Sequence, residues 1–147
     1  ILIVLRNPVH TIFSHYNHLN FNYPEAFYGN DFHTEIDRYN LSDSKYSWAL
    51  KLRRQGLYYE NLKNFLDSPL NITVLIFEEV FCNEMIYSQE LNDFFGLNID
   101  IKLPHDHKSK ILHTLDSNLY KKLLNYYSKD IEKTSDLLKI NLDKYWN

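Results

Sequence analysis

The chain opens with an uninterrupted apolar run, Ile1 to Leu5, which ends at Arg6-Asn7-Pro8. An apolar run without polar alternation is typical of a strand buried on both faces, as in a parallel sheet. Asn7 followed by Pro8 predicts a helix start, with Asn as N-cap and Pro at the first helical position. An apolar face then recurs at helical spacing, formed by Val9, Ile12, Phe13 and Tyr16. We therefore predict a strand, a tight turn and a helix, which is half of a βαβ unit.

A second strongly apolar, β-branched strand is predicted at Ile72 to Phe77. Helical patterns cover residues 48–54, 57–66, 85–95, 119–127 and 131–140. Two buried strands with intervening helices predict the α/β class: a parallel sheet flanked by helices. No repeat or linker divides the chain, so residues 1–147 are interpreted as a single domain.

Local signals mark several helix ends and faces. Asp67-Ser68-Pro69 is predicted to stop helix 57–66, which should face the core through Leu62, Phe65 and Leu66. Gly96 is predicted to end helix 85–95. The polar segment from Asn20 to Ser44 is interpreted as a long loop with short helical pieces, either part of a substrate groove or a poorly ordered insertion.

Composition restricts the class of function. The chain is 44% hydrophobic and 24% charged, which is typical of a globular domain. A net charge of −3 argues against a general nucleic-acid binder. The lone Cys82 cannot form an intrachain disulfide. The longest apolar run is far shorter than the ~20 residues needed to cross a bilayer, so no membrane span is expected. The chain begins with Ile1, and its one methionine is Met85, which favours a fragment or processed product.

The residues after the first strand predict an anion site. Ligands of parallel α/β sheets bind beyond the carboxyl ends of the strands, where Arg6 is expected. Its guanidinium carries a permanent charge and a fork that matches phosphate oxygens. The unpaired N–H groups of the following helix start would point to the same place. Ser14 lies off the apolar face, on the side of His10. The alternative is that Arg6 pairs with a carboxylate and Ser14 is merely solvated.

The same residues carry a resemblance to a known family. Arg6-Asn7-Pro8 followed by Ser14-His15-Tyr16 resembles the 3′-phosphate-binding signature of sulfotransferases that use 3′-phosphoadenosine-5′-phosphosulfate (PAPS). Gly56 to Leu62 is similar to the Gly-x-Tyr helix of that family, and Ile72 to Val80 to the strand and acidic turn that follow. Lys108-Ser109-Lys110 stands where related carbohydrate and heparan-sulfate-type sulfotransferases have a basic loop. All four segments occur in the family's order.

The resemblance implies a P-loop-like sulfotransferase fold and a function. Arg6 and Ser14 would hold the 3′-phosphate of the nucleotide, and Lys108, Ser109 and Lys110 would cover it. The complete enzyme would transfer a sulfuryl group from PAPS to a hydroxyl or amine, with a saccharide as the expected acceptor. Thr11 departs from the pattern, because many relatives carry a basic residue there. The loop at 108–110 lacks the glycine that often gives such loops their tight turn.

One part of the family's site has no counterpart in this sequence. A cradle for the 5′-phosphosulfate needs clustered glycines and a lysine. Gly29, Gly56 and Gly96 are widely separated, so the cradle is expected upstream of residue 1, together with the catalytic base. The domain is accordingly interpreted as incomplete at its N-terminus and inactive alone, and no catalytic residue is assigned.

Two other functions remain open from the sequence. A P-loop-type kinase or other nucleotide-dependent transferase could use the same strand, Arg and helix, and a non-catalytic helical interaction domain could use Arg6 structurally. No metal is expected, because His15 and His18 supply fewer ligands than a zinc site needs. The compartment stays open: the cytoplasm for a bacterial protein, the Golgi lumen for a eukaryotic carbohydrate sulfotransferase.

Overall fold

The computed structural model describes residues 1–23, 31–37, 53–82, 84–99 and 114–146. At its centre, strands β1 (Leu2–Leu5) and β2 (Thr73–Ile76) pair in parallel. Leu2 lies opposite Thr73 and Leu5 opposite Ile76. The prediction of a parallel α/β arrangement is confirmed, with both strands where the apolar runs placed them.

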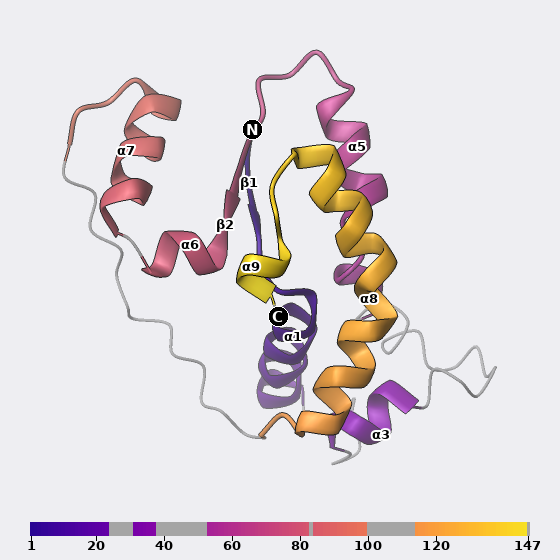
Figure 1. Ribbon diagram of the computed structural model, residues 1–147. Coiled ribbons are helices and arrows are strands. Elements are labelled where there is room, and N and C mark those ends of the chain that lie inside the picture. Colours follow the sequence, from indigo (N-terminus) through magenta and orange to yellow (C-terminus); the bar gives the residue numbers. More distant parts are fainter. Residues whose placement is uncertain (24–30, 38–52, 83, 100–113, 147) are drawn as a thin grey trace.

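Helices lie on both sides of this strand pair (Figure 1). In chain order they are α1 (Pro8–Asn22), α3 (Phe32–Asp37), α5 (Tyr59–Leu66), α6 (Phe77–Cys82), α7 (Glu84–Phe95), α8 (Ser117–Leu138) and α9 (Asp143–Trp146). Figure 1 shows α5 and α8 running side by side on one side of the strands, with α6 and α7 on the other. The short α9 lies where β1 ends and α1 begins.

Helix α1 starts as the sequence predicts. The Asn7 side-chain oxygen accepts hydrogen bonds from the backbone N–H groups of Val9 (2.9 Å) and His10 (3.3 Å), which makes it the N-cap. Val9, Ile12 and Tyr16 are fully buried. The apolar face inferred from the spacing is therefore the face that packs into the core, and the helix runs on to Asn22.

The two faces of the strand pair belong to different clusters. Ile3, Leu5, Val74 and Ile76 join the main core, which α1, α3, α5, α8 and α9 complete. Its largest fully buried side chains are Trp146, Tyr16, Tyr127, Ile12, Ile36 and Leu123. The opposite face contributes Leu2 and Leu75 to a small cluster with Val80 and Leu91.

The second face is covered only in part, so the prediction of strands buried on both faces is wrong for β1. Val4 alternates with Ile3 and Leu5 along the strand and is 50% exposed. Ile1, just before the strand, is also exposed. Among the described residues, the cluster with α6 and α7 covers Leu75 of β2 and part of Leu2, but it does not cover Val4, which lies opposite Leu75 on the neighbouring strand.

The prediction of two helices at 119–127 and 131–140 is also wrong, because α8 is a single helix from Ser117 to Leu138. Residues 128–130, which separated the two predicted helices, lie inside this helix. Its Asp130 instead stays helical and accepts hydrogen bonds from the backbone N–H groups of Tyr58 (2.7 Å) and Tyr59, at the start of α5. Asp116 caps the beginning of α8, and Lys139 ends it in the left-handed conformation.

Helix α5 is shorter and more exposed than expected. It begins at Tyr59 and ends before Asp67, as the stop signal predicts. Leu62 is buried against α8, whereas Phe65 and Leu66 are exposed, so their predicted core positions are wrong. Only one face of this helix meets α8, and these two side chains lie outside it.

Parts of the predicted organisation lie outside the described residues. These are residues 48–52 of a predicted helix, residues 24–30 and 38–44 of the predicted loop, and the segment 100–109. Within the predicted loop, α3 is described, and its Phe32 packs edge-on against Phe13 with ring centroids 5.0 Å apart. None of the described helices is long and apolar enough to cross a membrane.

Candidate anion-binding site

Three segments that lie far apart in the sequence meet at the carboxyl end of β1. The Tyr58 hydroxyl donates a hydrogen bond to the Arg6 carbonyl oxygen (2.9 Å) and lies 3.0 Å from the Thr11 hydroxyl. The Asn7 backbone N–H donates to Glu78 Oε1 (2.9 Å). Burial raises the pKa of Tyr58 to about 12, so this hydroxyl keeps its proton. The turn after β1 is thus fixed from α5 and α6.

The Arg6 guanidinium is held without a carboxylate partner. Its central carbon lies 4.5 Å from the centroid of the Phe77 ring, in a cation–π contact. Its buried Nε has no hydrogen-bond partner, and among the described residues no carboxylate forms an ion pair with it. The alternative, in which Arg6 forms an ion pair with a carboxylate of the chain, is therefore not observed within the described residues. Within the described residues, the contact that holds the guanidinium is the Phe77 ring.

The nearby carboxylate of Glu78 is occupied on both oxygens. Oε1 accepts from the Asn7 backbone, and Oε2 accepts from the Trp146 indole N–H (2.9 Å). Because each oxygen already has a donor, this carboxylate is held toward α9 and the turn. Its negative charge remains nearby without neutralising Arg6 directly.

The far end of the chain fastens the same turn. The Asn7 side-chain amide donates to the Tyr120 hydroxyl (2.9 Å) and to the Trp146 carbonyl oxygen (3.0 Å), and Asn7 is almost fully buried. The sequence singled out neither Tyr120 nor Trp146 for this site. Trp146 lies 139 positions from Asn7 in sequence, so no local spacing could have indicated the contact.

The helix start does not offer free N–H groups, which corrects the expectation. Pro8 has no N–H, and those of Val9 and His10 are used by the Asn7 side chain. The N–H of Thr11 donates to the Asn7 carbonyl oxygen (2.9 Å). An anion at this place would therefore be held by side chains, with only the helix dipole added.

Ser14 lies on α1, six residues after Pro8 and about 9 Å further along the helix axis. It is half-buried, and its hydroxyl makes no hydrogen bond within the described part of the chain. No direct contact joins Ser14 to Arg6. A ligand that contacts both side chains would have to lie between the turn and Ser14. The long Arg6 side chain shortens the distance that such a ligand must span.

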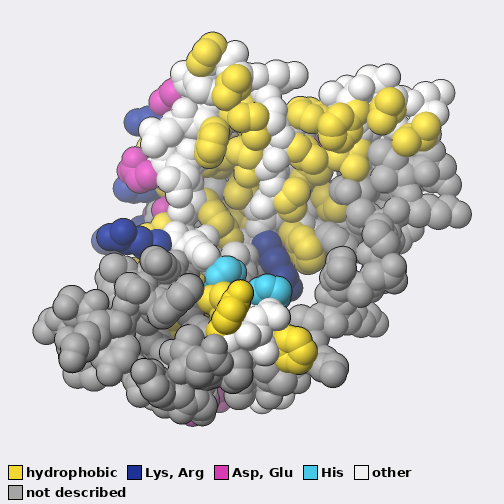
Figure 2. Space-filling model, turned by 180° about the vertical axis from the view of Figure 1, so that it is seen from behind, with side chains coloured by type: hydrophobic (Ala, Val, Ile, Leu, Met, Phe, Trp, Pro, Cys, Tyr) yellow, Lys and Arg dark blue, Asp and Glu magenta, His cyan; other side chains and the backbone are white. Residues whose placement is uncertain are grey.

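His10 is exposed on the first turn of α1, one turn before Ser14. Its ring centroid is 5.5 Å from that of Tyr120. Burial of the ring lowers the pKa of His10, the charge of Arg6 lowers it further, and Glu78 acts in the opposite sense. Figure 2 shows a Lys or Arg side chain beside two His side chains, bordered by hydrophobic surface.

The remaining predicted nucleotide contacts, Lys108, Ser109 and Lys110, lie outside the described residues. Thr11, where the family pattern has a basic residue, contacts Tyr58 and so helps to join α1 to the start of α5. Across the described ranges, no three His, Cys, Asp or Glu side chains are arranged to hold a metal ion.

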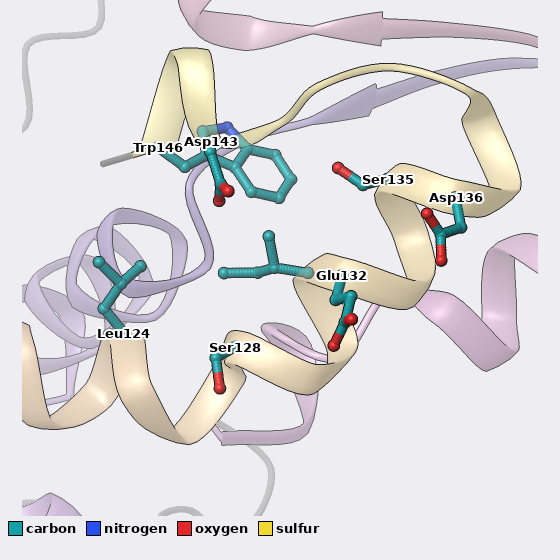
Figure 3. Close-up of a pocket in the computed structure, with 8 residues that line it drawn as sticks. Leu124, Ser128, Glu132, Ser135, Asp136, Asp143 and Trp146 are labelled. Carbon is teal, nitrogen blue, oxygen red and sulfur yellow. The ribbon is translucent and has the colours of Figure 1, made fainter.

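A separate cavity of about 420 Å³ lies between α8 and α9. Figure 3 shows Trp146 and Asp143 of α9 on one side and side chains of α8 on the other. The cavity is lined by Leu124, Ser128, Ile131, Glu132, Ser135, Asp136, Asp143 and Trp146. Three carboxylates line it without a basic side chain, so it repels phosphate and is not the anion site.

Comparison with solved structures identifies the fold. The chain matches the crystal structure of a sulfotransferase from Alicyclobacillus acidocaldarius with a TM-score of 0.76 and 24% sequence identity, over 99% of this chain. The chain therefore has a sulfotransferase-type fold. It spans 56% of that sulfotransferase, a little over half its length. No protein-family model matches the sequence, and no curated protein is significantly similar to it.

Proposed function

We propose that this chain is the part of a PAPS-dependent sulfotransferase that holds the 3′-phosphate of the nucleotide. The observation that carries the proposal is Arg6. This permanent cation stands at the carboxyl end of a parallel strand, in a sulfotransferase-type fold, and has no carboxylate partner in the described chain.

Arg6 and Ser14 have separate roles in this proposal. The Phe77 ring and the Tyr58 hydrogen bond fix Arg6, which supplies charge and paired N–H donors to the phosphate oxygens. Ser14 supplies a further hydroxyl donor from α1. Lys108, Ser109 and Lys110 are proposed to cover the nucleotide from the other side. No metal is proposed.

The reaction follows from the chemistry of the donor. The bond between sulfur and the 5′-phosphate oxygen breaks, and a new bond forms between sulfur and the acceptor oxygen or nitrogen, which loses a proton. Adenosine 3′,5′-bisphosphate leaves. Arg6 acts at the end of the nucleotide remote from sulfur, so it contributes binding and orientation rather than bond breaking. A carbohydrate hydroxyl or amine is the proposed acceptor.

The groups that contact the sulfuryl group are proposed to come from polypeptide outside residues 1–147. The solved sulfotransferase is nearly twice as long, and the described part of this chain contains no glycine-rich phosphate cradle. Binding of the nucleotide and transfer of the sulfuryl group are accordingly separable in this protein, and binding is the property to test first.

The test is calorimetric titration of the folded chain with adenosine 3′,5′-bisphosphate and with ATP. We expect selective binding of the bisphosphate, abolished by Arg6→Ala and reduced about tenfold by Ser14→Ala, because a hydrogen bond to a charged group contributes about 1.5–3 kcal/mol. Arg54→Ala, at an exposed arginine, is the matched control and should bind normally.

Other outcomes identify the competing functions. Preference for ATP would favour a kinase or another nucleotide-dependent transferase. Absence of binding to either nucleotide, by a chain whose circular dichroism shows the expected helices, would favour a non-catalytic interaction domain and overturn the proposal.

A further inference from the structure

The anion site contains one more group whose charge can change near neutral pH. His10 follows Arg6 by four residues and precedes Ser14 by four, so on α1 it faces the same side as Ser14. The residue is partly exposed, and one side of its ring packs against Tyr120. The Tyr120 hydroxyl accepts a hydrogen bond from the side chain of Asn7, the neighbour of Arg6, so the His10 ring lies near the turn that carries Arg6.

We propose that His10 is a second cationic group of this site and that a bound phosphate causes its imidazole to take up one proton from solvent. The inference rests on the proposed function, because it concerns the same phosphate. It adds a residue that the sequence analysis did not assign to the site and a pH dependence that Arg6 and Ser14 alone do not produce.

The surroundings of His10 explain why the proton arrives with the ligand. Partial burial of the ring and, secondly, the positive charge of Arg6 both favour the neutral imidazole when no anion is bound. Glu78 offsets this only in part, because both its oxygens are engaged by Asn7 and Trp146. Tyr120, on α8, is the titratable group whose ring packs against that of His10. A phosphate dianion reverses the sign of the local charge and makes the imidazolium favourable.

The proposal predicts linked changes in affinity and protonation. A rise of one unit in the pKa of His10 on binding makes the affinity about tenfold weaker when the pH rises from below both pKa values to above them. Relative to His10→Gln, the wild-type chain should bind the bisphosphate more tightly at pH 6 than at pH 8, because the loss of phosphate charge at low pH weakens binding in both chains. His10→Gln should remove that additional dependence, leaving only the part due to the phosphate's own titration.

The experiment combines calorimetry and NMR. Adenosine 3′,5′-bisphosphate is titrated into the wild-type chain, His10→Gln and His18→Gln between pH 6 and pH 8. His18 is the matched control, since it lies two turns further along α1, is exposed and neighbours Asn22. In the wild-type chain, the imidazole resonances give the pKa of His10 with and without the ligand, which requires no variant to fold.

The outcomes separate this inference from the function on which it rests. Binding together with a raised His10 pKa supports both. Binding with an unchanged His10 pKa, or with the same pH dependence in His10→Gln as in the wild type, overturns the role of His10 and leaves the phosphate site intact. Failure of the wild-type chain to bind at any pH overturns both.

Discussion

Asn7 connects more parts of the molecule than any other residue of the turn after β1. Its side-chain oxygen caps α1, and its side-chain amide reaches Tyr120 and the backbone of Trp146. Its backbone N–H holds Glu78. Asn7 therefore fixes the position of Arg6, the proposed ligand-binding residue. Its own polar groups are used within the protein and are not proposed to contact the ligand.

Replacement of Asn7 by Ala should lower the free energy of unfolding by about 2–4 kcal/mol, because the cap is lost and buried partners are left unpaired. Asn7→Ser should recover part of the loss, since a hydroxyl can still cap the helix. Urea denaturation measures both. Asn61→Ala, at an exposed position of α5, is the control. An Asn7→Ala chain as stable as the wild type would contradict this account.

Gly56 is required for steric reasons and Gly96 for backbone conformation. A Cβ at Gly56 would lie 2.7 Å from the Tyr127 ring, whose hydroxyl is held by the Arg53 carbonyl oxygen. Gly56→Ala should therefore cost about 1–3 kcal/mol of overpacking. Gly96 has a φ of +65° and open space around it, so Gly96→Ala should cost only about 1 kcal/mol. Thermal or urea unfolding gives the order, and equal costs would contradict the steric explanation.

At the scale of elements, Asp130 joins α8 to the start of α5. Burial raises the pKa of this carboxyl, although hydrogen bonds from the Tyr58 and Tyr59 backbones oppose the rise. The folded chain therefore binds the Asp130 proton more tightly than the unfolded chain. Its contribution to stability is greatest below the unfolded pKa and decreases as the pH rises through the higher, folded pKa.

Two substitutions test this link between α5 and α8. Asp130→Asn keeps an acceptor and removes the titration, so its stability relative to the wild type should improve as the pH rises from 4 to 7. Asp130→Ala leaves two backbone N–H groups without their acceptor and should cost about 1–3 kcal/mol at pH 7. Urea unfolding at both pH values provides the comparison. A constant difference between wild type and Asp130→Asn would exclude the proposed titration.

The same helices show where sequence reasoning reached its limit. The cap at Asn7, the second strand and the stop after Leu66 depend on neighbouring residues, and all were predictable. The predicted strand 72–77 was one residue too long at each end, because β2 is Thr73–Ile76 and Phe77 begins α6. The continuity of α8 was not, because the role of Asp130 depends on α5, 71 and 72 positions away. The exposure of Phe65 likewise depends on what covers α5, which its helical spacing does not indicate.

The candidate site divides in the same way. Arg6 and Ser14 were identified because their spacing within one short segment resembles a family signature. Glu78 and Trp146 shape the site through contacts that span 71 and 139 positions, respectively, from Asn7. Local sequence carries no trace of such pairings. The structure was required to show that the acidic turn and the last helix meet the same strand end.

At the scale of the whole molecule, the small sheet exposes apolar surface. Val4 and Ile1 are about half exposed, and Figure 2 shows hydrophobic side chains spread over much of one face. Among the described residues each strand pairs only with the other, which leaves one edge of each strand without a strand partner. The sulfotransferase with the same fold is nearly twice as long, so it has additional residues that could cover such a surface.

The 147-residue chain should therefore self-associate when expressed alone. Val4→Lys should reduce the association at equal concentration and leave the urea midpoint within experimental error, because Val4 is half exposed. Leu97→Lys, at an exposed leucine after α7, is the control and should associate like the wild type. Sedimentation equilibrium measures the difference. A monomeric wild-type chain would show that this strand surface is not adhesive.

Trp146 is a buried core residue that also holds Glu78 near the proposed site. Trp146→Phe keeps an aromatic ring but removes the N–H that holds Glu78, which frees a carboxylate oxygen to compete for Arg6. Binding of adenosine 3′,5′-bisphosphate should weaken about tenfold, since a charged hydrogen bond is redirected. Tyr145→Phe, which removes the hydrogen bonds of this hydroxyl with Glu79 and Lys144 and leaves Glu78 untouched, should bind normally. Equal calorimetric affinity of Trp146→Phe and wild type would contradict the link.

The contact between Asn7 and Trp146 also has a consequence for biosynthesis. A ribosome delivers the turn that carries Arg6 long before it delivers α9, since chains are made from the N-terminus. Arg6, the proposed phosphate-binding residue, is therefore synthesised well before α9, but its surroundings are completed only after Trp146 has left the ribosomal tunnel. A nascent chain stalled before α9 would display Arg6 on a turn that lacks its contacts with Trp146, so the proposed nucleotide recognition should begin only once α9 has emerged.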